Sequence, residues 1–299
     1  MALDDLSRLP TEASNPATQN LDRLTTLDLV RALHEADYDV LTAIEAELPK
    51  IAIAIDGIVA WLERDGRLFY QGAGTSGRLG VLDASECPPT FNTRQEMVQG
   101  LIAGGDAALR RSIERAEDDV AQGRRDLEAH GFSSCDVLVG IAASGRTPYV
   151  LGGMKYARDV GALTIGLSCV PGSALSQAGD LAITPATGPE AVTGSTRMKA
   201  GTAIKMVLNM LSTGAMVRLG YVFGNLMVNV QPVNEKLRDR ATRIIATVTG
   251  LGYNEAAALL QSAGSVKAAI VMRRLGLDRT EAEKRLVAAH GRLRQALEK

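Results

Sequence analysis

Three short segments rich in glycine and hydroxyl side chains are suited to bind an anion. They are residues 72–78 (GAGTSGR), 142–148 (AASGRTP) and 193–199 (TGSTRMK). Small residues let the backbone approach an anion, and hydroxyl groups donate hydrogen bonds. A following helix adds free N–H groups and the positive end of its dipole. If the three loops converge, we expect them to bind a ligand with many oxygens, such as a sugar phosphate.

The first loop taken alone has other interpretations. Its glycines, Gly72-x-Gly74-x-x-Gly77, also fit a dinucleotide-binding fingerprint, for which Asp106 could supply the ribose-binding acid. They could equally do no more than turn the chain. A dinucleotide site does not need the second and third loops, whereas a sugar phosphate does. The three loops together therefore favour a phosphosugar ligand.

Carboxylates are the best candidates for proton transfer. The three histidines and three cysteines are scattered, without metal-ligand spacing or a CxxC pair, so we expect no metal site. Glu86 precedes Cys87-Pro88-Pro89, a run that indicates a constrained, partly buried segment, although a surface turn is the alternative. A general acid there needs a raised pKa, which burial away from cations supplies.

A second carboxylate candidate lies in a highly charged segment. Glu117 is flanked by Glu114 and Asp118, and solvated ion pairs along a helix are the simpler interpretation of such a segment. The residue pattern alone does not single out Glu117 among these neighbours.

The hydrophobic pattern predicts the elements that position these loops. From residue 67 onward, short apolar runs bounded by Gly, Ser, Asp or Pro alternate with amphipathic segments, as buried parallel strands and helices do. The expected strands are Leu68–Gly72, Val98–Ala103, Val137–Ala142, Leu163–Leu167 and Leu181–Thr184. The expected helices between and after them are Asp106–His130, Thr147–Val160 and Thr196–Leu219. This alternation predicts an α/β fold with a doubly wound, mostly parallel sheet, whose ligands bind beyond the carboxyl ends of the strands.

Composition divides the chain into three predicted parts. Residues 1–64 form an N-terminal helical segment packed on the core, with helices at Thr26–Glu47 and Ile51–Glu63. Residues 65–234 form the phosphosugar-binding domain. Residues 235–299 carry Arg, Lys and Glu at helical spacing and form a small helical domain of three or four helices.

The overall charge excludes several classes of partner. Lys+Arg 33 nearly balances Asp+Glu 34, so no strong field favours nucleic acid or an anionic membrane. The N-terminus shows no signal peptide, and no run of about 18 apolar residues could span a bilayer. Scattered cysteines are typical of reduced thiols. We expect a cytoplasmic protein whose partner is a small molecule.

At its three loops the sequence resembles the sugar isomerase (SIS) domain family. Residues 142–147 (AASGRT) match the Ser-rich phosphate loop of that family. Longer strings narrow the resemblance to its etherases, which cleave the lactyl ether of N-acetylmuramic acid 6-phosphate. These strings are residues 72–91, 140–149 and 192–213, and the resemblance spans nearly the whole chain. Ile204 departs from it, because the family usually has Gln there, and the segment after Arg94 matches loosely.

The resemblance implies roles for particular residues. Glu86 is implied to be the acid that protonates the departing ether oxygen, and Glu117 the base that acts on carbon 2 of the sugar. The implied substrate-binding residues are Thr75, Ser76, Gly77, Ser144, Gly145, Arg146, Thr147, Ser195, Thr196 and Lys199. The implied reaction needs no cofactor and no metal. A homodimer with sites near the interface is also implied, and the long apolar helix 202–216 agrees with it.

Two rival classes of protein stay open. A regulator with a SIS domain would sense sugar phosphates and keep the loop hydroxyls, but could lose Glu86 or Glu117. Both carboxylates are present, which favours an enzyme. A nucleotide-dependent oxidoreductase built on residues 72–77 would instead bind a nicotinamide cofactor.

Overall fold

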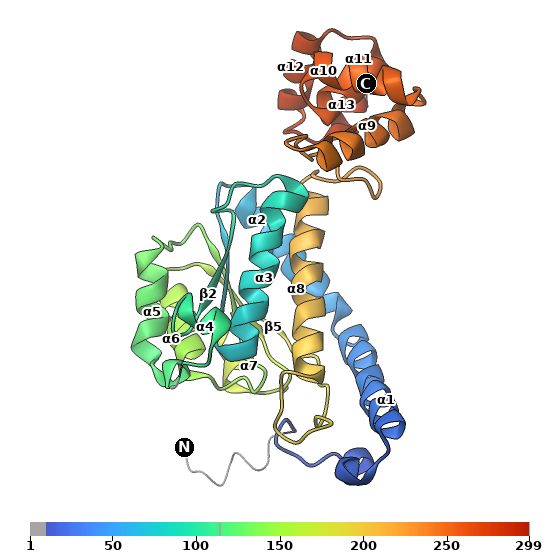
Figure 1. Ribbon diagram of the computed structural model, residues 1–299. Helices are drawn as coiled ribbons and strands as arrows, with labels where there is room; N and C mark the ends of the chain where they lie inside the picture. The colour runs from blue at the N-terminus through green and yellow to red at the C-terminus, as the bar shows by residue number, and fades with distance from the viewer. Residues whose placement is uncertain (1–9, 114, 299) are drawn as a thin grey trace. The chain divides into compact units, whose positions relative to one another are not determined.

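The computed structural model describes residues 10–113 and 115–298, which fall into two compact units (Figure 1). The first unit holds the described residues up to Ser85 together with Glu96–Ser212, and the second holds Glu86–Gln95 together with the described residues from Thr213 onward. Each unit has its own hydrophobic core. The domain boundaries expected at residues 64 and 234 stay predictions.

The first unit is built on a five-stranded parallel sheet with the order β2-β1-β3-β4-β5. The strands are β1 (Leu68–Gly72), β2 (Val98–Ile102), β3 (Val137–Ile141), β4 (Leu163–Leu167) and β5 (Leu181–Ile183). All five predicted strands are confirmed, with β2, β3 and β5 one residue shorter at the carboxyl end. The chain pairs β2 on one side of β1 and then crosses to β3 on the other. The boundary between β1 and β3 is therefore the topological switch point, where ligands of such sheets bind.

Helices cover both faces of this sheet. On one face lie α5 (Val120–Ala129), α6 (Pro148–Asp159) and α7 (Ala174–Ala178), and on the other lie α2 (Leu48–Leu62) and α3 (Gly74–Phe91). Phe69 of β1 packs in the core beneath α5 and α6, whereas the next residue, Tyr70, packs against Gly80 of α3. Successive residues of one buried strand thus serve different helix layers. The predicted doubly wound α/β class is confirmed.

The remaining elements of the first unit are short, or lie before and after the sheet. They are η2 (Pro16–Thr18), η3 (Leu21–Arg23), α1 (Thr26–Glu45), α4 (Ala107–Arg110), η4 (Ala116–Asp118) and α8 (Lys199–Arg218), which continues into the second unit. Among the described residues, no helix is both long enough and apolar enough to cross a bilayer.

The helical part of the second unit has more helices than expected. They are α9 (Glu235–Thr249), α10 (Tyr253–Ala263), α11 (Val266–Leu275), α12 (Arg279–Ala288) and α13 (Leu293–Leu297). Gly250, Gly264 and Gly276 end three of them in the left-handed conformation, with φ of +75°, +76° and +67°. Each glycine therefore separates two helices, and the prediction of three or four helices is wrong.

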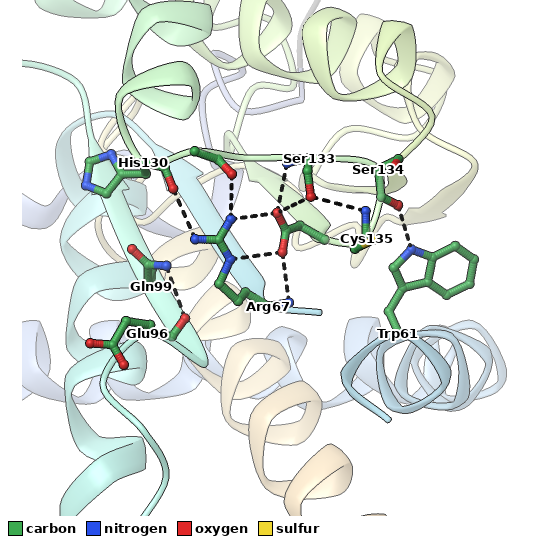
Figure 2. Close-up of polar contacts among 10 residues, drawn as sticks. Trp61, Arg67, Glu96, Gln99, His130, Ser133, Ser134 and Cys135 are labelled. Atoms are coloured by element: carbon green, nitrogen blue, oxygen red, sulfur yellow. Dashed lines mark hydrogen bonds and ion pairs between the residues drawn. The ribbon is translucent and has the colours of Figure 1, made fainter. Parts of the chain in front are cut away.

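An ion pair joins the starting ends of the two central strands. Arg67 precedes β1, and its backbone N–H and Nε both donate to Asp136 Oδ1, each at 3.0 Å, while Nη2 lies 2.8 Å from Oδ2. The guanidinium also donates to the carbonyls of His130 and Gly131. Figure 2 shows Arg67 at the centre of this network. Ser133 lies beyond the Asp136 carboxylate and bonds to its other side.

The network fixes the ionisation of a buried carboxyl group. Asp136 is 2% exposed, and burial alone would raise its pKa. The hydrogen bonds from Arg67 and from the Ser133 backbone outweigh burial, so the pKa of Asp136 lies below its ordinary value. The carboxylate is therefore charged at neutral pH and satisfied from several directions.

Asp136→Asn should lower the free energy of unfolding by about 3 kcal/mol at pH 7, because Arg67 is left without its carboxylate. Since the folded-state pKa is lowered, this stability is present above the ordinary carboxyl pKa and is lost as pH falls through the lowered value. Urea unfolding at pH 7 and near pH 3 measures it, and the difference from wild type should shrink in acid. Glu128→Gln breaks an exposed pair with Arg124 and should cost less than about 1 kcal/mol. Equal losses in the two variants would contradict this account.

Candidate active site

The first loop closes tightly at the carboxyl end of β1. A Cβ on Gly77 would lie 2.7 Å from the Gly72 oxygen and 2.6 Å from Ile102 Cγ1, so no side chain fits there. Gly74 opens α3 with φ of +53°. The predicted ligands Thr75 and Ser76 lie on the first turn of α3, Thr75 half-buried and Ser76 buried. Their hydroxyls make no hydrogen bond to any described residue, so both are available to a ligand.

The second loop closes in a similar way after β3. Gly145 has φ of +67°, and a Cβ there would collide with the Ser173 side chain. Thr147 is the N-cap of α6 but does not cap it with its side chain. Within the part of the chain that the structure describes, the half-buried side chains of Ser144, Arg146 and Thr147 have no hydrogen-bond or ion-pair partner. This loop presents two free hydroxyls and a cation at the start of a twelve-residue helix.

The third loop differs from the prediction, because the start of α8 is already occupied. The carboxylate of Glu190, 1% exposed, accepts hydrogen bonds from the backbone N–H groups of Lys199 at 2.9 Å and Ala200 at 3.0 Å. The Lys199 side chain is also 1% exposed, and its Nζ lies 2.8 Å from Asp39 Oδ2 of α1. Neither the first N–H groups of α8 nor the Lys199 ammonium is free for a phosphate in this structure.

What remains available in the third loop is its hydroxyl pair. Ser195 and Thr196 are half-buried, and neither side chain bonds to another described residue. A Cβ on Gly201, in the first turn of α8, would lie 3.5 Å from both Thr75 Cγ2 and the Thr196 oxygen. The first and third loops therefore meet at Gly201. Ile204, where the family usually has Gln, is 1% exposed and belongs to the buried side of α8.

A buried cysteine connects the second and third loops. The Cys169 backbone N–H donates to the Ala143 oxygen at 2.9 Å, and its Sγ donates to the Ala200 oxygen at 3.9 Å. Burial raises the pKa of Cys169 to about 12, so the thiol stays protonated and serves as a packing group. The predicted convergence of the three loops at one edge of the sheet is thus present in the structure.

Glu117 does not lie in a long helix. The predicted helix Asp106–His130 is wrong as a single element, because the chain instead forms α4, η4 and α5. Arg115 adopts the left-handed conformation with φ of +61°, and Asp119 then caps a new helix by accepting from the Gln122 N–H at 2.9 Å. Glu117 is exposed on η4, which packs against α6, the helix that follows the second loop.

Glu86 is also exposed, although its neighbour Cys87 is only 2% exposed. The two prolines lie inside α3 and do not form a surface turn. Thr75 and Glu86 are eleven residues apart on this helix, a separation of about 16 Å along its axis. The burial that a general acid needs is absent from the single chain, and α3 keeps Glu86 away from the first loop of the same chain.

The sequence did not reveal how two buried carboxylates, Glu190 and Asp83, are engaged. Glu190 caps α8 from nine residues upstream, and Asp83 accepts from Asn209 Nδ2 at 2.6 Å and from Ser212 Oγ at 3.1 Å. Their partners are backbone groups or residues far away in the sequence. No local spacing could therefore have revealed them, and Asp83 is engaged in holding α8 to α3.

Comparisons with known proteins identify sequence relatives of this chain. Residues 50–158 match the family described as the glucokinase regulatory protein N-terminal SIS domain. The chain is 52% identical to "N-acetylmuramic acid 6-phosphate etherase 2" of Vibrio parahaemolyticus over 98% of both sequences. It is 53% identical to "N-acetylmuramic acid 6-phosphate etherase" of Pasteurella multocida over 97% of this chain and 96% of the relative. A solved phosphoheptose isomerase from Francisella tularensis shows 21% identity and a TM-score of 0.47, covering 65% of this chain and all of that one.

The parallel sheet, the switch point and the hydroxyl-rich loops define a phosphosugar-binding protein of the SIS type. Within that class, the near-full-length identity to curated relatives is specific. The chain belongs to the N-acetylmuramic acid 6-phosphate etherase family.

Ser144→Ala should weaken binding of an amino-sugar 6-phosphate about tenfold or more, because a hydrogen bond to a charged oxygen contributes roughly 1.5–3 kcal/mol. Titration calorimetry on the folded protein gives the dissociation constant. Ser262→Ala, which removes a hydroxyl bonded to the Leu259 oxygen, is the matched control and should bind like wild type. An unchanged affinity in Ser144→Ala would move the phosphate to Ser195 and Thr196.

Proposed function

We propose that this chain cleaves the lactyl ether of N-acetylmuramic acid 6-phosphate, giving N-acetylglucosamine 6-phosphate and D-lactate. The observation that carries this proposal is the identity of 52–53% with etherases over nearly the whole chain. Three converging loops support it, because their hydroxyls have no partner among the described residues and the substrate offers a phosphate and many other oxygens. A sugar phosphate of this kind is a charged metabolite, and we expect the enzyme to act in the cytoplasm.

The ether bond is best broken by elimination. An alkoxide is a poor leaving group, so direct hydrolysis is slow. In the open-chain aldehyde, the hydrogen on carbon 2 lies next to a carbonyl group and is acidified. Its removal leaves a carbanion, and the ether oxygen on carbon 3 departs with a proton. Water then adds to the unsaturated aldehyde. These steps need a base, an acid and polarising donors, and no redox cofactor.

Two carboxylates are assigned to these proton transfers. Glu117 takes the proton from carbon 2, and its position on η4 against α6 supports this role, since α6 begins at the second phosphate loop. Glu86 protonates the departing lactyl oxygen. The phosphate is assigned to the loop hydroxyls of Ser76, Ser144 and Thr147, together with the amide groups at the helix starts.

The protein is proposed to act as a homodimer. The apolar residues of α8 do not supply the interface, because Val207, Leu208 and Leu211 are fully buried within the chain. A different apolar face is exposed on α1, which Figure 1 shows as the long blue helix. This face consists of Leu27, Val30, Tyr38 and Leu41, which are 56–60% exposed and recur at helical spacing. An exposed apolar stripe of this length is suited to a second copy of the chain.

Dimerisation would also account for the exposure of Glu86 and for its distance from the first loop. Along α3 this residue is about 16 Å from the first loop of its own chain and is exposed there. A second copy can bring its own Glu86 to the site and cover it, which supplies the burial that a general acid needs. We therefore assign Glu117 and Glu86 of one site to different chains.

Wild-type protein should release D-lactate from the substrate without added cofactor, and both Glu117→Gln and Glu86→Gln should lose turnover by about 100-fold or more. Glu117→Gln should also lose exchange of the carbon 2 hydrogen with solvent. Glu86→Gln should retain some exchange, because carbanion formation does not await the acid. An enzymatic lactate assay and exchange measured by NMR report the two steps separately.

Mixing the two inactive variants tests the shared site. If each site takes its carboxylates from two chains, subunit exchange produces mixed dimers with one intact site. About a quarter of wild-type turnover should then return, since half of the dimers are mixed. If both carboxylates of a site come from one chain, no turnover returns. Near wild-type turnover in both separate variants would show that the carboxylates are misassigned.

A further inference from the structure

Arg78 is a cation of the first loop to which the proposed function assigns no task. It lies on α3 directly after Gly77, and its side chain is half-buried. Its Nε donates to the Leu109 oxygen at 3.2 Å, and its Nη2 donates to the Arg111 oxygen at 3.4 Å. Among the described residues, no carboxylate pairs with this guanidinium. Arg78 is thus directed at the backbone of the segment that follows β2.

That segment has little regular structure of its own. Helix α4 has only four residues, and Arg111 leaves it in an extended conformation with φ of −144°. Arg115 is left-handed, and among the described residues the next helix is η4. The packing of Ile113 over Gly104, where an added Cβ would lie 3.0 Å away, gives one further contact. Side chains of neighbouring elements that bond to the backbone of such a short, irregular segment help to keep it in place.

Glu117 lies between two fixed points of the chain. On its carboxyl side, Asp119 caps α5 and pairs with Arg125 at 3.0 Å. Ala116, next to it, packs in the core formed with α6. Further back along the chain on its amino side, the guanidinium of Arg78 donates to the Leu109 and Arg111 oxygens. Removing the Arg78 guanidinium would loosen the chain that leads into the turn carrying Glu117.

We propose that Arg78 is a positioning residue that fixes Glu117 relative to the first phosphate loop. The inference rests on the assignment of Glu117 as the base under the proposed function. Arg78 follows the tightly packed Gly77, so its place is set by the same backbone that holds the phosphate. Its two hydrogen bonds fix the Leu109 and Arg111 backbone, and therefore the chain leading to Glu117, relative to that loop. Arg78 would then hold the phosphate loop and the base at a fixed spacing, as proton removal from carbon 2 of a sugar bound by its 6-phosphate requires.

Arg78→Gln tests this role, because a displaced base lowers kcat whereas a lost phosphate contact raises KM. A base displaced by about 1 Å can cost about 100-fold in rate. We expect the kcat for carbon 2 exchange to fall by about that factor, while KM stays within about threefold of wild type. Lactate release should fall in parallel, since it follows exchange. Arg78→Lys, which keeps a cation able to reach one carbonyl, should recover part of the exchange rate.

The matched control is Arg110→Gln, which removes the same charge from an exposed side chain of the same segment and should behave like wild type. Binding of one amino-sugar 6-phosphate per chain in calorimetry verifies folding. If Arg78→Gln fails to fold, the intermediate exchange rate expected for Arg78→Lys carries the test.

A KM raised with exchange kcat unchanged would show that Arg78 binds phosphate and would overturn the inference. Unchanged kcat and KM would overturn it as well. Absence of exchange and lactate release from wild type would instead remove the proposed function.

Discussion

The ion pair between Arg67 and Asp136 is the interaction on which the site geometry depends. It joins the residues just before β1 and β3, the two strands that border the switch point, and it is supported by backbone bonds at both ends. In the register of these two strands, Leu68 pairs with Val137 and Gly72 pairs with Ile141. A slip of one residue would reverse the faces of every side chain on one strand. The loops at the opposite ends of the two strands would then no longer lie side by side.

Polar groups inside the first unit are mostly used up by the framework. Glu190 accepts hydrogen bonds at the start of α8, Asp83 accepts one from the middle of α8, and Lys199 pairs with Asp39 of α1. The hydroxyls of the three loops, in contrast, have no hydrogen-bond partner among the described residues. This division lets one edge of the sheet be rigid and still bind a ligand: carboxylates from distant parts of the chain hold the helices, while the loop hydroxyls are left for hydrogen bonds to a ligand.

The sequence was sufficient for the sheet and insufficient for its connections. Short buried runs such as Leu163–Leu167 are too short for a helix and are bounded by turn residues, so all five strands could be predicted. The charged segment around Glu117 looked like a continuous helix because propensity does not reveal the left-handed Arg115 that breaks it. The cap from Glu190 and the pairing of Lys199 are tertiary contacts and leave no local trace. The distance of Glu86 from the first loop follows from the length of α3, which the two prolines inside the helix hid: they indicated a constrained, partly buried segment and not the end of a long helix.

We propose that the ether is broken by elimination and water addition. Turnover in heavy-oxygen water, with mass spectrometry of both products, tests it most directly. Elimination cleaves the bond from carbon 3 to the ether oxygen, so lactate keeps that oxygen and the label enters N-acetylglucosamine 6-phosphate. In deuterium oxide, carbon 2 should also gain solvent deuterium. Label in lactate, with carbon 2 left unexchanged, would mean direct hydrolysis at the lactyl carbon and would contradict the account.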